Sequence, residues 1–259
     1  MMNMKFKMIV ISLSLVSITL SAQHVRFLTE GIIEFERSTN AHALINKRMK
    51  SGDNNFMGQV YEQYKKSTPQ FIRSKSTLYF SKDKTLFQPI EDESVPNRFF
   101  AEDPAINQIN HIYADLAEQK QITQKKVYEE TFLVSDSTRK INWKITEERR
   151  EIAGYSCRRA NAVIMDSIYV VAFYCDEIAV SGGPESFNGL PGMILGVALP
   201  YENVTWFAQT VKDMPVFAKV LVPPVKGKKL DNKGLISTLK SALQNWGTSV
   251  NTALKIYLL

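Results

Sequence analysis

The sequence predicts an α+β protein built on a strongly curved antiparallel β-sheet, in the form of an open half-barrel, with one or two helices packed against it. Three observations predict this fold. Residues 125–211 alternate between β-rich runs and turn residues, and residues 56–67 and 235–246 carry apolar side chains at helical spacing. Because the connections between the strand-like runs are only a few residues long, neighbouring strands are expected to pair antiparallel.

The N-terminal half predicts a strand, a helix and a hairpin in that order. Strands are indicated by alternation of apolar and polar residues, and the helix by apolar residues three and four positions apart before a proline. The predicted elements are a strand at 25–36, a polar loop with a short helical piece at 38–55, a helix at 56–67, and strands at 71–81 and 84–90 joined by a turn.

Residues 91–124 show no firm periodicity. They contain Pro96, Pro104 and many acidic and amide side chains, so we expect one long excursion with a single short helix. Loops of that length in a compact domain are often functional or disordered.

The C-terminal region predicts a helix that covers one face of the sheet. Asp231 or Asn232 can cap its start, and Gly247 follows its end. Its apolar stripe consists of Leu235, Ile236, Leu239, Leu243 and Trp246.

The first 22 residues have the order of a secretory signal peptide. Lysines precede an uncharged run over residues 8–20, and the small residues Ser21 and Ala22 follow. The run is shorter than the roughly 20 residues of a membrane span. We therefore expect cleavage after Ala22, export to the periplasm or beyond, and one mature domain over residues 23–259 without an integral membrane span. An uncleaved anchor is the alternative.

The charge balance argues against a nucleic-acid partner. Without the leader the chain has 30 basic and 26 acidic residues, a net charge of +4, and its basic residues are scattered. We assign them to solvated faces and loops. An acidic partner or anionic lipid is the alternative, also for the cluster of Lys226, Lys228 and Lys229.

The two cysteines, Cys157 and Cys175, are each nine residues from Asp166, the centre of a predicted hairpin turn. In that register the two sulfurs lie directly opposite each other. The same register pairs apolar residues on one face, namely Ala160 with Ala172, Ala162 with Val170, and Ile164 with Ile168. We predict a structural disulfide in an oxidising compartment. A redox or metal-binding thiol pair and two free buried thiols are the alternatives.

Residues 182–199 read GGPESFNGLPGMILGVAL, a series of turns that leads into a strand. Leu190, Pro191, Gly192 and Met193 fit a type II turn, because proline fixes φ at the second position and glycine supplies a positive φ at the third.

This segment resembles the signature of the GLPGLI family of exported Bacteroidetes proteins, with Met193 where the family name has leucine. Residues 151–160 and 171–180 also resemble the family's strands. The resemblance implies export and a β-rich fold, but no activity.

Glycines in this corner would let another molecule approach the backbone closely, so we consider the corner a candidate rim for a ligand or partner. The alternative is a rigid corner that docks Phe187 and Leu190 into the core, with the acidic residues as solvated edge charges. The candidate rim residues are Asp176, Glu177, Gly182, Gly183, Pro184, Gly189, Leu190, Pro191 and Gly192.

Catalytic motifs are missing from the sequence. There is no G-x-S-x-G, H-E-x-x-H, Walker or G-x-G-x-x-G pattern, so we name no catalytic residue and expect no cofactor. Besides the two thiols, His24 is a candidate metal ligand, because cleavage after Ala22 would place it next to a new amine that can bind Cu(II) or Ni(II).

These observations favour a non-enzymatic envelope protein that binds an apolar small molecule or a membrane-protein partner. Two alternatives remain: metal handling through His24 or the two thiols, and a hydrolase without a linear signature.

Overall fold

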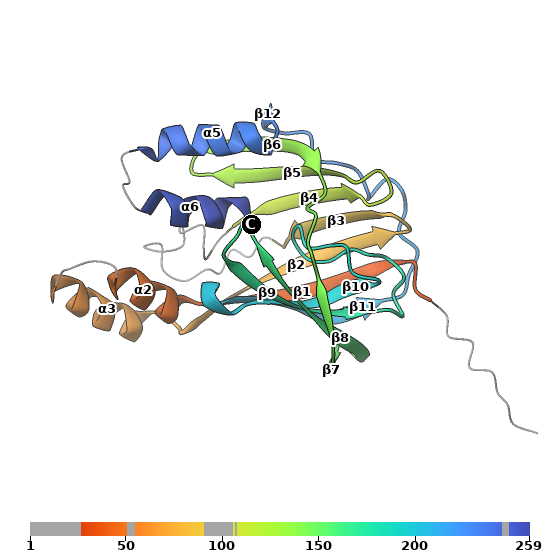
Figure 1. Cartoon of the computed structure of the whole chain (residues 1–259), viewed down its shortest axis with the longest axis horizontal. Helices are drawn as coiled ribbons and strands as arrows, with labels where there is room; N and C mark the ends of the chain where they lie inside the picture. The colour runs from red at the N-terminus through yellow and green to blue at the C-terminus, as the bar shows by residue number, and fades with distance from the viewer. Residues whose placement is uncertain (1–26, 51–54, 91–105, 107, 245–248) are drawn as a thin grey trace, which may run out of the picture.

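The computed structural model describes residues 27–50, 55–90, 106, 108–244 and 249–259. The predicted leader and His24 lie outside these residues. The described part forms one open twelve-stranded sheet with four α-helices, so the fold is mainly β rather than a balanced α+β fold (Figure 1). The prediction of a curved, open antiparallel sheet is confirmed, whereas one or two helices was too few. Among the described residues, no helix has the length and apolar character that a membrane crossing requires.

The strands follow the order β12-β6-β5-β4-β3-β2-β1-β11-β10-β9-β8-β7, which leaves β12 and β7 as free edges. Every pairing is antiparallel except that of β12 with β6. The strands are β1 (Glu30–Asn40), β2 (Phe71–Ser81), β3 (Lys84–Pro89), β4 (Asn110–Asp115), β5 (Lys120–Val127), β6 (Glu130–Ser137), β7 (Lys144–Ile152), β8 (Tyr155–Ile164), β9 (Ile168–Cys175), β10 (Met193–Leu199), β11 (Val204–Lys212) and β12 (Lys228–Leu230).

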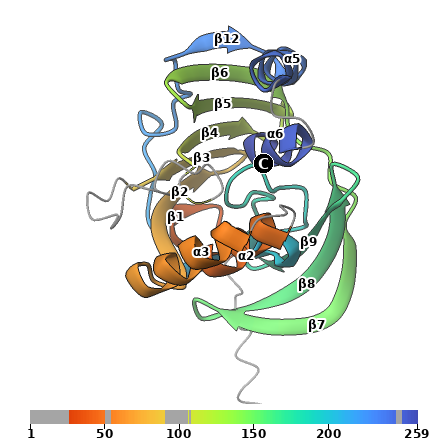
Figure 2. The ribbon, with the colours of Figure 1, turned by 90° about the vertical axis from the view of Figure 1, so that its left-hand side faces the viewer.

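The helices lie inside the curve and at one end of the sheet. Figure 2 shows the sheet bending from β12 through β1 to β7, with α5 and α6 on its concave side and α2 and α3 at the near end. The helices are α2 (Ala41–Lys50), α3 (Asn55–Ser67), α5 (Asn232–Ala242) and α6 (Ser249–Leu258), with a short 3-10 helix η1 (Pro200–Glu202).

Several local predictions are confirmed. Helix α3 and the hairpin of β2 and β3 match their predicted ranges to within one residue. Helix α5 begins after Asp231, whose Oδ1 accepts a 2.7 Å hydrogen bond from the Gly234 backbone N–H. Its buried residues Leu235, Leu239 and Leu243 pack on β5 and β6 together with α6, which the sequence analysis did not predict.

The first strand starts later and runs further than predicted. Its burial alternates through Asn40, and Arg37 and Thr39 take inward positions that apolar residues occupy earlier in the strand. There Arg37 Nη1 donates a 2.8 Å hydrogen bond to the Ile106 carbonyl. A polar side chain with a buried partner breaks the hydrophobic pattern without breaking the strand.

The predicted excursion at 91–124 is wrong from residue 110 onward, where β4 and β5 form instead. Inward positions of these strands include the buried polar residues Asn110, Thr123 and Lys125. The strands therefore lack the apolar alternation on which the prediction relied. Residues 91–105 and 107 lie outside the described part of the chain.

The predicted run of adjacent strands is confirmed for β7 to β11 but is wrong for β6. Strand β6 pairs with β5, far from β7 in the sheet order. Residues 138–143 connect these two distant strands. This connection brings Arg139 to the concave side of the sheet, where the cavity described below lies.

Candidate ligand-binding site

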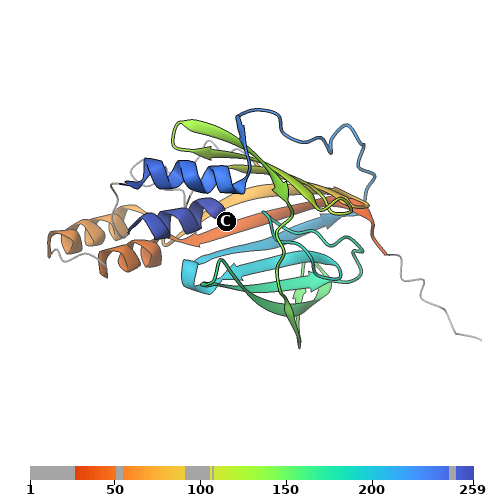
Figure 3. The ribbon, with the colours of Figure 1, turned by 45° about the horizontal axis from the view of Figure 1, so that its top comes forward.

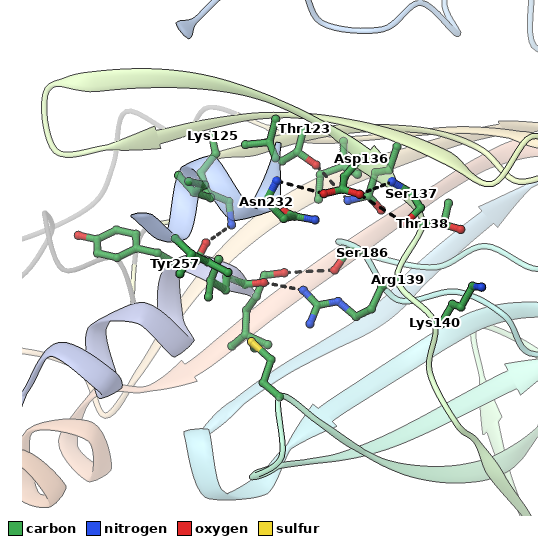
Figure 4. Close-up of a pocket in the computed structure, with 18 residues that line it drawn as sticks. Thr123, Lys125, Asp136, Ser137, Thr138, Arg139, Lys140, Ser186, Asn232 and Tyr257 are labelled. Carbon is green, nitrogen blue, oxygen red and sulfur yellow. Dashed lines mark hydrogen bonds between the residues drawn. The ribbon is translucent and has the colours of Figure 1, made fainter. Parts of the chain in front are cut away.

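A cavity of about 400 Å³ lies between the sheet and the two C-terminal helices (Figure 4). Residues of β4, β5 and β6 line it on one side, and α5 and the end of α6 line it on the other. The connection 138–140, Met165 at the tip of the β8–β9 hairpin, and Ser186 complete it. The site thus combines segments that are more than 100 residues apart in the chain.

Strand β5 positions the most unusual residue of the cavity. Side chains alternate between the two faces of a strand, so Thr123 and Lys125 point inward while Lys126 points to solvent. Lys125 is only 4% exposed, which is rare for a lysine. Its Nζ donates a hydrogen bond to the carbonyl of Tyr257 in α6.

Burial makes the charge of Lys125 costly. It lowers the pKa of the ammonium group to about 8, although the nearby Glu185 carboxyl opposes the shift, and Arg139 adds to it. A carbonyl partner satisfies one N–H but carries no full charge to balance the ammonium. The site therefore disfavours the ammonium form relative to water, although with a pKa of about 8 the side chain is still mostly protonated at pH 7.

The second cation of the cavity, Arg139, is partly buried. Its Nη2 donates a 2.5 Å hydrogen bond to the Leu258 carbonyl, and burial lowers the pKa of the guanidinium group. The Ser186 hydroxyl donates to the Leu259 oxygen at 3.2 Å. The carbonyl end of α6 thus lies among donors, as expected for the negative end of a helix dipole.

Glu185 is a buried carboxyl that lies close enough to Lys125 for their charges to interact. It lies in the segment before the GLPG sequence, at a φ of +50°, and its Oε2 accepts a 2.9 Å hydrogen bond from Asn110 Nδ2. Burial raises the pKa of this carboxyl, against the opposing effects of Asn110, Arg37 and Lys125. Trp206 also lowers this pKa, although its Nε1 makes no hydrogen bond within the usual limits. Burial therefore disfavours the charged form of both Lys125 and Glu185, and their mutual attraction does not fully compensate for it.

The predicted rim residues are mostly packed. Their role as a rim stays a prediction, but the structure places them as the alternative interpretation describes, with Phe187 and Leu190 in the core. Gly182, Gly183, Pro184, Leu190 and Gly192 are buried, whereas Asp176, Glu177, Gly189 and Pro191 are exposed. Ser186 of this segment lines the cavity, and Glu185 interacts electrostatically with Lys125.

The sequence analysis missed Lys125, Arg139, Glu185 and Ser186. One signal was available, because Glu185 and Ser186 stand between two glycine-proline turns in an otherwise small and apolar segment. Nothing near Lys125 or Arg139 in the sequence distinguished them from other basic residues.

The turn at Leu190–Met193 differs from the predicted type II turn in its hydrogen bonds. Gly192 has the predicted positive φ, +147°. Gly192 N donates to the Leu190 carbonyl at 2.8 Å, and Met193 N donates to Ile178 at 3.1 Å. The segment is therefore tied to the chain after β9 instead of closing on itself.

The predicted register around the cysteines is confirmed. Arg158 pairs with Tyr174 and Ile164 with Ile168, so continuing the register places Cys157 opposite Cys175. Both are free, buried thiols in this structure, and the predicted disulfide is not seen. Burial raises the pKa of Cys157 to about 12 and that of Cys175 to about 11. Thiols of such pKa are poor nucleophiles and poor metal ligands at neutral pH.

No group of three or more His, Cys, Asp or Glu side chains within the described ranges is placed to hold a metal ion. His42 is bonded to the backbone, with Nε2 2.9 Å from the Thr68 carbonyl oxygen.

Comparison with known families gives one match. Residues 116–196 match the family described as "Protein of unknown function (Porph_ging)". The Porph_ging match runs from the end of β4 to Gly196, so it includes Lys125, Arg139 and Glu185 as well as the GLPG sequence. The description of the matched family does not mention GLPGLI, so the resemblance to the GLPGLI family stays a prediction. No curated protein matches the chain.

Two solved structures resemble the fold. "Structure of PNGF-II in C2 space group" aligns with a TM-score of 0.51 and 14% identity over 79% of this chain and 31% of that chain. "Structure of PNGF-II in P21 space group" gives 0.51 and 16% over 81% and 33%. This chain thus spans about a third of the PNGF-II chain, and the likeness shows the fold alone.

Proposed function

We propose that the chain is an exported protein that binds a small amphipathic anion, a carboxylate with a short apolar tail, in the cavity between the sheet and the C-terminal helices. The observation that carries this proposal is the burial of Lys125, with the partly buried Arg139 beside it, in the lining of a cavity of about 400 Å³. That volume lies in the range of small-molecule sites. Export is supported by the leader sequence at residues 1–22.

Charge favours an anion. The charged side chains of the lining are the cations Lys125, Arg139 and Lys140 and the carboxylate Asp136, and the main-chain oxygens of Leu259 also border the cavity. Asp136 is already engaged by the backbone N–H groups of Ser137, at 2.7 Å, and Asn232, at 3.1 Å. A ligand carboxylate would balance the buried ammonium and replace its single carbonyl partner with a charged one.

The remaining lining favours an apolar tail. Apolar side chains from β4, β6, α5 and α6 contribute Ile112, Val134, Leu235, Ile236 and Leu258 to the cavity. The proposed ligand thus keeps the apolar character expected from the sequence and adds a charged head group. It gives no support to a membrane-protein partner at the same site.

Three probes of equal chain length test the head group. Titration calorimetry is expected to show that octanoate binds about tenfold or more tightly than 1-octanol, because a charge-assisted hydrogen bond contributes about 1.5–3 kcal/mol. Octylammonium is expected not to bind, since it would add a cation to a cationic site. Equal affinities for octanoate and octanol, or no binding of octanoate, would contradict the proposal.

We also propose that Cys157 and Cys175 form a disulfide after export, as their opposed positions allow. Protein from the oxidising compartment is then expected to resist alkylation until it is reduced and unfolded. Reduction is expected to lower the free energy of unfolding by about 3 kcal/mol, less any strain in the bridge.

Because both thiols have a high pKa, the folded reduced protein is expected to oxidise slowly in air. The double variant C157S/C175S serves as the control, since its stability should not respond to reductant. Full alkylation of the unreduced, unfolded secreted protein would refute the bridge.

A further inference from the structure

A long connection on the outside of the molecule has no role in the cavity. Residues 213–227, here called the strap, lead from β11 to β12 without regular secondary structure and run past the ends of the central strands (Figures 1 and 3). The strap is nevertheless held in place. Val216 N donates to Glu30 Oε2 at 3.4 Å, and Leu221 is buried.

The far end of the strap is also fixed. A Cβ atom on Gly227 would lie 2.8 Å from the Phe132 carbonyl carbon, so the backbone passes directly against β6. Beyond it, β12 pairs with β6. The strap is thus anchored at its start, middle and end.

This anchored segment exposes large apolar side chains. The exposed fractions are 42% for Met214, 69% for Phe217, 56% for Val222 and 76% for Val225. A single exposed apolar residue needs no explanation, but four within twelve residues of a fixed segment are unusual for a surface that meets only water.

Basic residues occur on the same stretch of chain, two in the strap and two in β12. Between Asp213 and Asp231 the sequence has no acidic residue and four lysines, Lys219, Lys226, Lys228 and Lys229. All four are exposed, and the Lys219 ammonium lies 5.6 Å from the centre of the Phe217 ring. Positive charge and exposed apolar side chains therefore occur on the same stretch of chain.

We propose that the strap docks on the surface of a membrane that contains anionic lipids. Apolar side chains would enter the boundary between head groups and acyl chains, while the lysines contact phosphate groups. A protein partner fits less well, because protein interfaces are enriched in arginine and depleted in lysine, and the strap has only lysine. This proposal is independent of the cavity and goes beyond the ligand proposed for it.

Vesicle sedimentation with the mature chain, residues 23–259, tests the charge. Binding is expected to vesicles of mixed phosphatidylglycerol and phosphatidylcholine and to be much weaker with phosphatidylcholine alone. The triple variant K226Q/K228Q/K229Q is expected to bind the anionic vesicles about a hundredfold more weakly, at about 1 kcal/mol per lysine. Added salt should weaken the wild type in the same direction.

The matched control is K66Q/K144Q/K240Q, which has the same net charge and changes exposed lysines on α3, β7 and α5. It is expected to bind nearly as well as the wild type. Equal loss in both triple variants would show attraction by net charge only and would overturn the strap as the docking surface. No binding to anionic vesicles would overturn the proposal altogether.

A second pair of variants tests apolar insertion. F217S/V225S is expected to weaken vesicle binding about tenfold or more, since both side chains lose apolar burial. V163S changes an apolar residue on β8 that is 59% exposed and should have no effect. An unchanged affinity of F217S/V225S would overturn insertion. Octanoate binding should be the same in all these variants, so a failure here is distinguishable from a failure of the cavity proposal.

Discussion

Replacing Gly192 with alanine is expected to lower the free energy of unfolding by about 3 kcal/mol or more, which is among the largest effects of a single substitution. Gly192 has a φ of +147°, and a Cβ atom there would lie 2.1 Å from the Cys175 carbonyl oxygen. That contact is with backbone at the end of β9, which cannot move without disturbing its pairing with β10. Chemical denaturation of the G192A variant measures the loss.

The control for this prediction is G154A. Gly154 also has a positive φ, +83°, but a Cβ atom there would have no neighbour within 4 Å. Its replacement is expected to cost only about 1 kcal/mol, the cost of an alanine in a left-handed conformation. The difference between the two variants isolates the close approach to Cys175. Equal losses would mean that this contact relaxes and that the corner is not rigid.

Replacing Lys125 with methionine is expected to abolish most octanoate binding and to leave the protein at least as stable as the wild type at pH 7. The loss of affinity should be about tenfold or more, because the substitution nearly keeps the length of the side chain and removes its charge and its N–H donors. Removal of a poorly balanced buried charge offsets the lost hydrogen bond to Tyr257, so the free energy of unfolding should be unchanged or higher by up to about 2 kcal/mol.

The K126M variant is the matched control. Lys126 is the next residue of β5, carries the same charge and faces solvent. It should alter neither octanoate binding nor stability. A loss of several kcal/mol in K125M at pH 7 would instead identify Lys125 as a structural ion-pair partner and would contradict its assignment to ligand binding.

The pH dependence gives an independent measurement on Lys125. Its pKa is about 8 in the folded protein and 10.5 in the reference state, so between these values the unfolded chain binds more protons. The free energy of unfolding of the empty protein should therefore rise with pH in that window, by about 3 kcal/mol in total from this group. Cys157 and Cys175 act in the opposite direction when reduced, because their pKa values are raised. The difference between wild type and K125M isolates the lysine.

The affinity for octanoate should fall with rising pH, whereas the free energy of unfolding rises. An anion prefers the protonated lysine, so octanoate affinity should decrease as the pH rises above about 8, while Arg139 stays charged. In K125M this decrease should be absent. A wild-type affinity that is constant from pH 7 to pH 10 would contradict a direct contact between Lys125 and the carboxylate.

Local sequence patterns were enough to predict those helices and strands whose signals lie within a few neighbouring residues. Helix α3, the β2–β3 hairpin, and helix α5 with its Asp231 cap were predictable because spacing, turn residues and caps are contained within a few neighbouring residues. The register of β8 and β9 was predictable for the same reason, since one short turn fixes it and apolar pairs support it. A positive φ at Gly192 followed from the proline before it.

Only the tertiary structure decided the site. Arg37, Asn110 and Lys125 take inward strand positions, which sequence patterns assign to apolar residues, because partners from distant segments satisfy them there. The sequence by itself could determine local geometry. It could not determine that residues 125, 139, 185 and 257 meet, since the free energy of a buried charge depends on the groups that surround it in space and not on its neighbours in the chain.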